Sequence, residues 1–262
     1  GRQLGIAILM HDAAHGLLFR HRRLNDWVGQ WLCAYPVATD LELYRPYHLT
    51  HHRFTQQPED PDLGLSAAFP ITRASLRRKV IRDLSGKTGY ERRKAQVLSA
   101  WGPPGLDPRG RLARLWGAFG GALIVNAVLF AGLAAAGAWW LYPALWLLPM
   151  FTWYQLISRI RNIAEHAVVP DNDDPLRNTR TTLAGPLTRL VLAPYRVNYH
   201  LEHHLLLFVP CWRLPAAHRL LIAKGYGPHL ELRRNYLEVL RLAASAVTGG
   251  EDGRRERGIQ HI

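Results

Sequence analysis

The histidines carry the clearest chemical signal in this sequence. There are 13 of them among 262 residues, and most fall in short clusters. The clusters are His11–His15 (HDAAH), His48–His52 (HLTHH), Asn162–His166 (NIAEH) and His200–His204 (HLEHH), and His21 trails the first one. Neutral imidazole is a good ligand for iron, zinc, copper and nickel. The clustering therefore predicts metal chemistry.

The spacing inside the clusters supports that prediction. On a helix, positions i, i+3 and i+4 share one face. His11 and His15 can therefore point at one metal, and each HxxHH cluster places two rings on one face with a third beside them. The first, second and fourth clusters contribute eight imidazoles, whereas one zinc ion takes about four ligands. We therefore expect two metal ions, each with an open position.

Each cluster alone has a simpler explanation. A single HxxxH is typical of a histidine pair on a helix surface, and a single HxxHH is only moderately specific. Two copies of HxxHH together with HxxxH are hard to explain in that way. The remaining histidines lack the spacing of the clusters and are expected at the surface. They are His21, His218, His229 and His261.

A long interval without charge separates the second cluster from the third. No charged residue occurs from Leu115 to Ser158, which is 44 residues. One transmembrane helix needs about 20 apolar residues, so the interval suits two helices and a tight turn. We predict spans near 117–138 and 143–160, with the turn at 139–143 because aromatic residues suit the membrane interface. A buried helical hairpin in a soluble core is the alternative.

The flanks of this hairpin are basic. Residues 73–114 hold 12 Lys and Arg and only three acids, and arginines follow the second predicted span. By the positive-inside rule both ends of the hairpin lie in the cytoplasm, so all four clusters can converge on that face. The net charge of +13 then suits anionic headgroups. Nucleic-acid binding is the rival explanation of the charge, but no nucleic-acid motif is visible.

Composition excludes several other classes. With 48% hydrophobic residues the chain is not disordered, and two cysteines exclude a disulfide framework. We expect one domain over 1–248, a disordered tail over 249–262, and an interfacial or re-entrant helix over 26–44 that Pro36 interrupts. Residues 74–94 are expected to form a basic surface helix and loop. Since the apolar run 4–10 starts abruptly, we expect that the chain is a fragment of a protein that continues upstream of Gly1.

The order HxxxH, HxxHH, hairpin, HxxHH resembles the integral-membrane fatty acid desaturase superfamily, which also includes hydroxylases and ketolases. The resemblance covers about residues 1–215. The motifs that carry it are HDAAH (11–15), YRPYHLTHH (44–52), EDPDL (59–63) and NYHLEHHL (198–205). It implies an all-α integral membrane helical bundle with the histidine-box helices on the cytoplasmic side. Members of the superfamily normally have about four spans, so the resemblance also implies a first hairpin upstream of Gly1. No cytochrome b5 domain is visible in this chain.

The resemblance also implies a set of metal ligands for two non-haem iron ions. His166 and Asn162 are included, the latter as a ligand through water, since some desaturases have Asn four residues before that His. The implied ligands are His11, His15, His48, His51, His52, Asn162, His166, His200, His203 and His204. Metal-bound histidines usually donate their other N–H to an acceptor. Candidates for that role are Asp12, Glu165 and Glu202, and also Asp60 and Asp62.

The implied activity is oxygen-dependent desaturation of a fatty acyl (acyl-lipid) chain, with dioxygen as co-substrate. Electrons would come from a separate ferredoxin or cytochrome b5-type donor with its reductase. The implied location is a membrane, with the bacterial inner membrane favoured. Two alternatives stay open: a di-iron hydroxylase or carotenoid ketolase, and a non-catalytic membrane protein that binds metal. Arg45, Arg159 and Arg161 could anchor the membrane interface or meet a headgroup, and anchoring is favoured.

Overall fold

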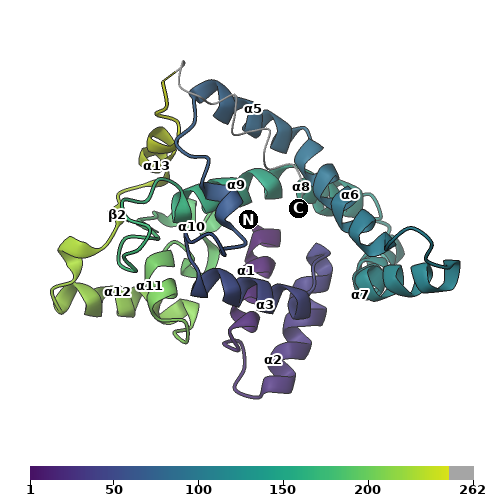
Figure 1. Cartoon of the computed structure of the whole chain (residues 1–262). Coiled ribbons are helices and arrows are strands. Elements are labelled where there is room, and N and C mark those ends of the chain that lie inside the picture. Colours follow the sequence, from purple (N-terminus) through teal and green to yellow (C-terminus); the bar gives the residue numbers. More distant parts are fainter. Residues whose placement is uncertain (248–262) are drawn as a thin grey trace. The chain divides into compact units, whose positions relative to one another are not determined.

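The computed structural model describes residues 1–247, which are mostly helical and contain one pair of two-residue strands (Figure 1). Its contacts divide into two compact units, one built from 2–45 and 80–156 and the other from Gly1, 46–79 and 157–247. Three helices have residues in both units: α3 (Leu41–Arg53), α5 (Arg73–Leu84) and α9 (Trp153–His166). The prediction of one domain over 1–248 stays a prediction, and the predicted tail 249–262 lies outside the described residues.

The unit built from 2–45 and 80–156 contains α1 (Arg2–Ala14), α2 (Arg22–Val28), η1 (Gly29–Ala34), η2 (Tyr35–Val37), α6 (Lys87–Trp101), α7 (Pro108–Ala135), η3 (Tyr142–Leu147) and α8 (Leu148–Phe151). In this unit, α1 packs mainly against η1. Buried side chains of α1, η1 and the start of α3 form one apolar cluster, which includes Met10, Cys33 and Leu41. The first histidine cluster lies at the end of α1, next to this apolar cluster, and its two histidines are buried.

The predicted break at Pro36 occurs. The π-helical turn η1 passes into the 3-10 turn η2, which ends at Ala38 in the left-handed conformation (φ 52°). Arg93 of α6 donates to the carbonyl of Val37 (3.0 Å), and so fixes this irregular end. The segment is therefore a packed corner of the fold.

Asp107 and Pro108 set the N-terminal end of α7. Asp107 accepts hydrogen bonds from the backbone N–H groups of Arg109 (2.9 Å) and Gly110 (3.0 Å), and Pro108 occupies the first turn. The helix has 28 residues, and among residues 1–247 it is the single helix long and apolar enough to cross a membrane. It ends three residues before the predicted end, at Ala135, because Gly137 takes a positive φ (71°) in the turn that follows.

The second predicted span, 143–160, is not one continuous helix. The chain passes through η3 and α8, breaks at Thr152 (φ −116°, ψ −87°) and resumes as α9. Pro149 lacks a backbone donor, and the Thr152 hydroxyl binds the carbonyl of Leu148 (2.7 Å). Both effects weaken a regular helix at this point, so hydropathy alone predicted the wrong helix boundaries.

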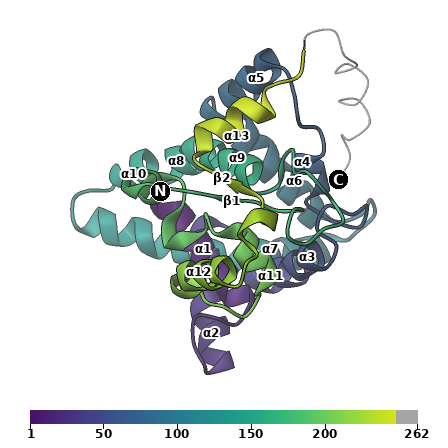
Figure 2. The ribbon, with the colours of Figure 1, turned by 90° about the vertical axis from the view of Figure 1, so that its left-hand side faces the viewer.

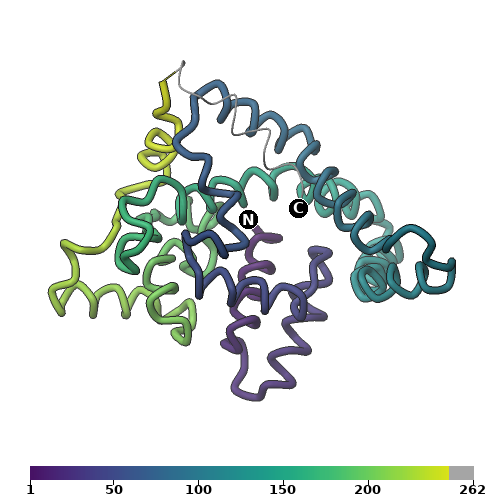
Figure 3. Tube along the Cα trace, viewed as in Figure 1, coloured from purple at the N-terminus to yellow at the C-terminus, as the bar shows by residue number. Residues whose placement is uncertain are grey.

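The other unit surrounds the strand pair. It contains α4 (Leu63–Ser66), β1 (Thr181–Thr182), α10 (Pro186–Val191), η4 (Pro194–Arg196), α11 (His200–Leu205), η5 (Cys211–Arg213), α12 (Leu214–Ala223), η6 (Gly227–His229), β2 (Leu232–Arg233) and α13 (Tyr236–Ala243). Strands β1 and β2 are parallel, with Thr181 opposite Leu232 (Figure 2). Figure 3 follows the irregular path of the chain between the end of α9 and β1. Three of the four histidine clusters lie in this unit.

Candidate metal centre

Four histidines from three helices form a compact group. They are His51 of α3, His166 at the end of α9, and His200 and His204 of α11. One ring nitrogen of each lies within 4.8 Å of the corresponding atom of every other. His200 and His204 are one helical turn apart, so both rings leave the same face of α11. The fold thus brings together residues that lie far apart in the sequence.

The ring nitrogens in this group face one another. The Nε2 atom of His200 lies 2.8 Å from Nε2 of His166 and 3.0 Å from Nε2 of His204. A neutral imidazole carries one proton on its two nitrogens, so such a set cannot satisfy every facing nitrogen by hydrogen bonds alone. Converging lone pairs of this kind are what a cation requires, and imidazole nitrogen suits a transition metal.

Two of the four rings have partners that set the tautomer. The Nδ1 atom of His51 lies 2.8 Å from Oδ1 of buried Asp60, which accepts a hydrogen bond from its N–H group. The Thr55 hydroxyl donates to the carbonyl of His51 (2.8 Å), so it can accept a proton from Nδ1 of His204 (3.1 Å). Both arrangements leave Nε2 unprotonated and directed into the group. Hydrogen bonds to the outer nitrogen are typical of metal-binding histidines.

The other two rings are buried without such partners. Within residues 1–247, the Nδ1 atoms of His166 and His200 have no hydrogen-bond partner. Burial lowers the pKa of His166, His200 and His204 well below the usual value, and positive charge on neighbouring histidines and on Arg161 acts in the same direction for His166 and His200. The rings are therefore neutral at physiological pH, which is the form that binds metal.

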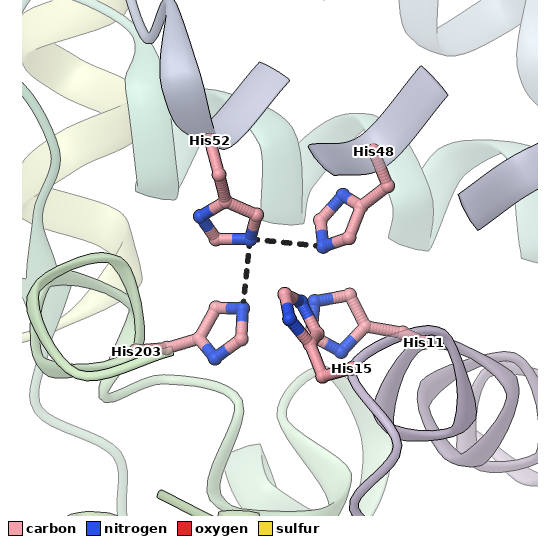
Figure 4. Close-up of side chains that lie close together, drawn as sticks. All are labelled: His11, His15, His48, His52 and His203. Atoms are coloured by element: carbon pink, nitrogen blue, oxygen red, sulfur yellow. Dashed lines mark hydrogen bonds between the residues drawn. The ribbon is translucent and has the colours of Figure 1, made fainter. Parts of the chain in front are cut away.

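His48, His52 and His203 form a second group in the same unit. Nε2 of His52 lies 2.9 Å from Nε2 of His48 and 3.0 Å from Nε2 of His203. Figure 4 shows these three rings turned toward one another. The second and fourth clusters thus each divide their histidines between two groups, which is what two metal positions would require.

The first cluster lies at the end of α1, in the unit built from 2–45 and 80–156. The His11 and His15 rings, also drawn in Figure 4, have centroids 5.0 Å apart. Nδ1 of His11 lies 3.2 Å from Oδ1 of Asp12, a predicted partner. Burial lowers the pKa of His15 to about 4, although the charge of Asp12 opposes the shift. Participation of these two rings in a metal site stays a prediction.

Arg45 has an internal role at the same place. Its guanidinium donates to the carbonyls of Ala14 (3.0 Å) and Ala13 (3.1 Å) and forms an ion pair with Asp26. It therefore caps the C-terminal end of α1, where a cation is favourable. The structure gives Arg45 these partners within the fold, and its predicted role as a membrane anchor stays a prediction.

The other predicted carboxylates have different environments. Glu165 receives two hydrogen bonds from Arg161, at 2.7 and 2.9 Å, and one of its oxygens lies 3.9 Å from Nε2 of His200. Glu202 is fully buried and binds the Thr181 hydroxyl and Nδ1 of His218 (2.6 Å). Both acids are thus held by residues outside the predicted ligand set.

Several of the remaining histidines can now be placed. His218 was expected at the surface, which is wrong: it is half-buried because it pairs with Glu202. His21 and His229 are exposed, and His21 accepts from the backbone N–H of Leu24 at the start of α2. His261 lies outside the described residues. Asn162 is half-buried on α9, one turn before His166, and its role as a ligand stays a prediction.

Sequence reasoning missed Thr55 and Gln56. Gln56 donates from its backbone to Asp60 (2.9 Å) and from its side chain to the carbonyl of His166 (2.7 Å), with φ at 65°. Val168 (φ 52°), two residues after His166, and Tyr195 (φ 51°), five residues before His200, are also left-handed. Such strain costs about 1–3 kcal/mol per residue and gathers at functional sites.

Comparison with known proteins agrees with this geometry. The chain matches the family described as fatty acid desaturase over residues 1–235. It is 26% identical to a dihydrorhizobitoxine desaturase of Bradyrhizobium elkanii, with 83% of this chain and 64% of that protein aligned. It is 24% identical to a beta-carotene 4-ketolase of Protosiphon botryoides (82% and 48%) and 24% identical to a beta-carotene ketolase of Paracoccus sp. strain PC1 (81% and 73%).

The chain spans less than two thirds of the first two of these relatives. The family match covers most of its length, including every histidine cluster. Histidine groups able to bind metal are present at the positions of these clusters. The chain therefore belongs to the fatty acid desaturase family, within a superfamily of membrane-associated di-iron oxidoreductases that includes desaturases and ketolases.

Proposed function

We propose that this protein is an oxygen-dependent di-iron desaturase that introduces a double bond into a fatty acyl chain held in a lipid bilayer. The observation that carries the proposal is the convergence of His51, His166, His200 and His204, whose ring nitrogens lie within 4.8 Å of one another. Nε2 of His200 is 2.8 Å from that of His166 and 3.0 Å from that of His204. A site built only for structure would not need so many buried neutral imidazoles, since each buried ring loses hydration.

The two histidine groups of this unit would hold one iron each. His48, His52 and His203 would contribute to the second ion, and His11 and His15 of the first cluster would be further iron ligands, as the resemblance implies. Asn162 would contribute through a water molecule. When bound, the two irons would supply the redox chemistry that reduces dioxygen and removes hydrogen from an unactivated carbon.

The overall reaction fixes what must be delivered. Two hydrogens leave adjacent methylene carbons, and dioxygen with two further electrons and two protons becomes two waters. The electrons would come from a separate ferredoxin or cytochrome b5-type donor. The acyl chain and the donor are thus the partners that we propose, in addition to the bilayer.

The side chains of this protein prepare the site for that chemistry. Asp60 holds the proton on the outer nitrogen of His51, and Thr55 can do so for His204. Burial keeps the inner nitrogens neutral and limits access of water. These contacts orient the ligands before metal binds, so that little reorganisation is needed.

A membrane location is part of the proposal. Helix α7 supplies one apolar segment, and most residues of that segment are exposed on the protein. We propose an integral membrane bundle with the histidine clusters on the cytoplasmic face, in a bacterial inner membrane. The uncharged interval Leu115–Ser158 and the basic residues on either side of it support this orientation.

Oxygenation of a carbon to an alcohol or ketone is the second candidate. The similarity to two beta-carotene ketolases favours it, at identities close to that of the desaturase relative. Metal ligands alone do not separate these outcomes, because the placement of the substrate decides between them. A metal-binding protein without turnover is the third candidate, from a different class.

A product profile tests the proposal. The full chain is expressed in a host with a ferredoxin system, and total lipids are analysed by gas chromatography–mass spectrometry. His203→Ala removes a predicted ligand, and His229→Ala alters an exposed histidine outside the clusters. We expect a new unsaturated acyl chain with the wild type and with His229→Ala, and none with His203→Ala. A hydroxylated or keto product would favour the second candidate, and bound metal without any product would favour the third.

A further inference from the structure

Three consecutive residues outside the histidine clusters connect two of the helices that carry them. Arg180, Thr181 and Thr182 are each at most 2% exposed, and Thr181 and Thr182 form β1. Along a strand, successive side chains point to opposite sides. Here Arg180 and Thr182 contact α9, whereas Thr181 contacts α11. We call residues 180–182 the strut.

The contacts with α9 are at the end of the helix that carries His166. Arg180 donates from Nη1 to the carbonyl of Ala167 (2.9 Å) and from Nη2 to that of Val168 (2.8 Å). The hydroxyl of Thr182 lies 3.4 Å from the carbonyl of Ala164. Val168 is β-branched and left-handed, a conformation that persists only where its surroundings enforce it. Arg180 enforces it by binding its carbonyl oxygen.

Arg180 is itself held in place. Its Nε donates to Oε1 of Glu231 (3.0 Å), and the backbone N–H of Thr181 donates to the carbonyl of Glu231 (3.1 Å). A fully buried guanidinium is stable only when it is paired and hydrogen-bonded. The pairing of β1 with β2 thus supplies the partner that allows this charge to sit beneath α9.

The contact with α11 comes from the next residue. The Thr181 hydroxyl donates to Oε2 of Glu202, which lies between His200 and His203 in the sequence. Oε1 of Glu202 accepts from Nδ1 of His218 on α12 (2.6 Å). Glu202 is 0% exposed, so each donor that it loses leaves a buried carboxylate oxygen without a partner.

We propose that the strut is a positioning element for the metal site: it fixes α9 relative to α11 and thereby sets the spacing between His166 and His200. The two rings meet at 2.8 Å between their Nε2 atoms, and within residues 1–247 neither ring has a hydrogen bond at Nδ1 to orient it. Their orientation therefore depends on the helices that carry them. This inference rests on the proposed metal site.

Substitutions of buried threonines test it. Thr181→Val keeps the shape of the side chain and removes the hydroxyl, and Thr181→Ser restores the hydroxyl. Thr179→Val is the matched control, because Thr179 is also 0% exposed but its hydroxyl has no partner among the described residues. Thr182→Val removes a longer contact and keeps the test decisive if Thr181→Val does not fold. Each full chain is purified in detergent, stripped of metal and titrated with Co²⁺ followed by its visible absorption.

We expect Thr181→Val to bind Co²⁺ about 10–100-fold more weakly and with a changed ligand-field spectrum, and Thr181→Ser to recover both. Thr182→Val should lose a few-fold in affinity, and Thr179→Val should match the wild type. Loss of thermal stability in Thr181→Val with an unchanged Co²⁺ spectrum and affinity would overturn the positioning role. A wild type that binds no Co²⁺ would overturn the proposed metal site, and the strut's role with it.

Discussion

The outer nitrogen of His51 shows how one hydrogen bond can set the chemistry of a ligand. Asp60 lies 2.8 Å from that nitrogen and is buried, whereas Asp62 lies 3.9 Å away and is more exposed. We predict that Asp60→Ala lowers metal affinity by about 10–100-fold, because His51 then loses the partner that fixes its tautomer. Metal content after dialysis against a weak chelator measures this. Asp62→Ala is the control, and an equal loss in both variants would contradict a specific role for Asp60.

Asp26 forms an ion pair with Arg45 near the end of α1. Although burial alone would raise the pKa of Asp26, hydrogen bonds from Asn25, Arg45 and Arg22 outweigh it and lower the pKa. A lowered pKa in the folded state gives stability that is present above the usual value of about 4 and is lost as the pH falls through the folded value.

We therefore predict that Asp26→Asn lowers the melting temperature equally at pH 7 and pH 5.5, and that its difference from the wild type shrinks below pH 4. Thermal unfolding in detergent at several pH values measures this. A difference that already disappears between pH 7 and pH 5.5 would rule out Asp26 as the titrating group.

At the scale of elements, helix packing explains a glycine that periodicity does not. A Cβ atom at Gly89 of α6 would lie 2.6 Å from the carbonyl oxygen and 2.7 Å from the Cα of Phe151 in α8. We predict that Gly89→Ala destabilises the protein by about 1–3 kcal/mol, since both contacts are backbone atoms. Gly117→Ala in α7 has open space around it and should stabilise by about 0.5–1 kcal/mol. Melting temperatures that fall in both variants would contradict this packing.

The sequence predicted the cluster histidines and the chemistry that they share, because a helical spacing of three and four residues is visible without a structure. It also predicted the break at Pro36 and an apolar helix near 117–138, of which α7 covers all but the last three residues. It did not predict Thr55, Gln56, the strut or the burial of His218, because each of these acts through a partner far away in the chain. The break at Thr152 was missed since Pro149 and a side-chain hydrogen bond override hydropathy.

At the scale of the whole molecule, the proposed membrane location would account for the apolar side chains that α7 exposes. Val128 and Leu112 are both 68% exposed on this helix, but Val128 lies at the centre of the predicted span 117–138, whereas Leu112 precedes that span. We predict that Val128→Arg reduces membrane insertion at a cost of about 2.5–3.5 kcal/mol. Leu112→Arg should insert normally because its side chain can reach the interface. Membrane fractionation of the two variants measures this, and equal insertion would contradict a transmembrane α7.

The proposed function requires that histidines from separate clusters hold two iron ions. The direct measurement is iron per chain in the purified protein, for the wild type, His200→Ala and His229→Ala. His200 contacts two other ligand rings at 2.8 and 3.0 Å, whereas His229 is exposed outside the clusters. We expect two irons per chain in the wild type and in His229→Ala, and fewer in His200→Ala. No iron in the wild type, or the same content in all three proteins, would contradict it.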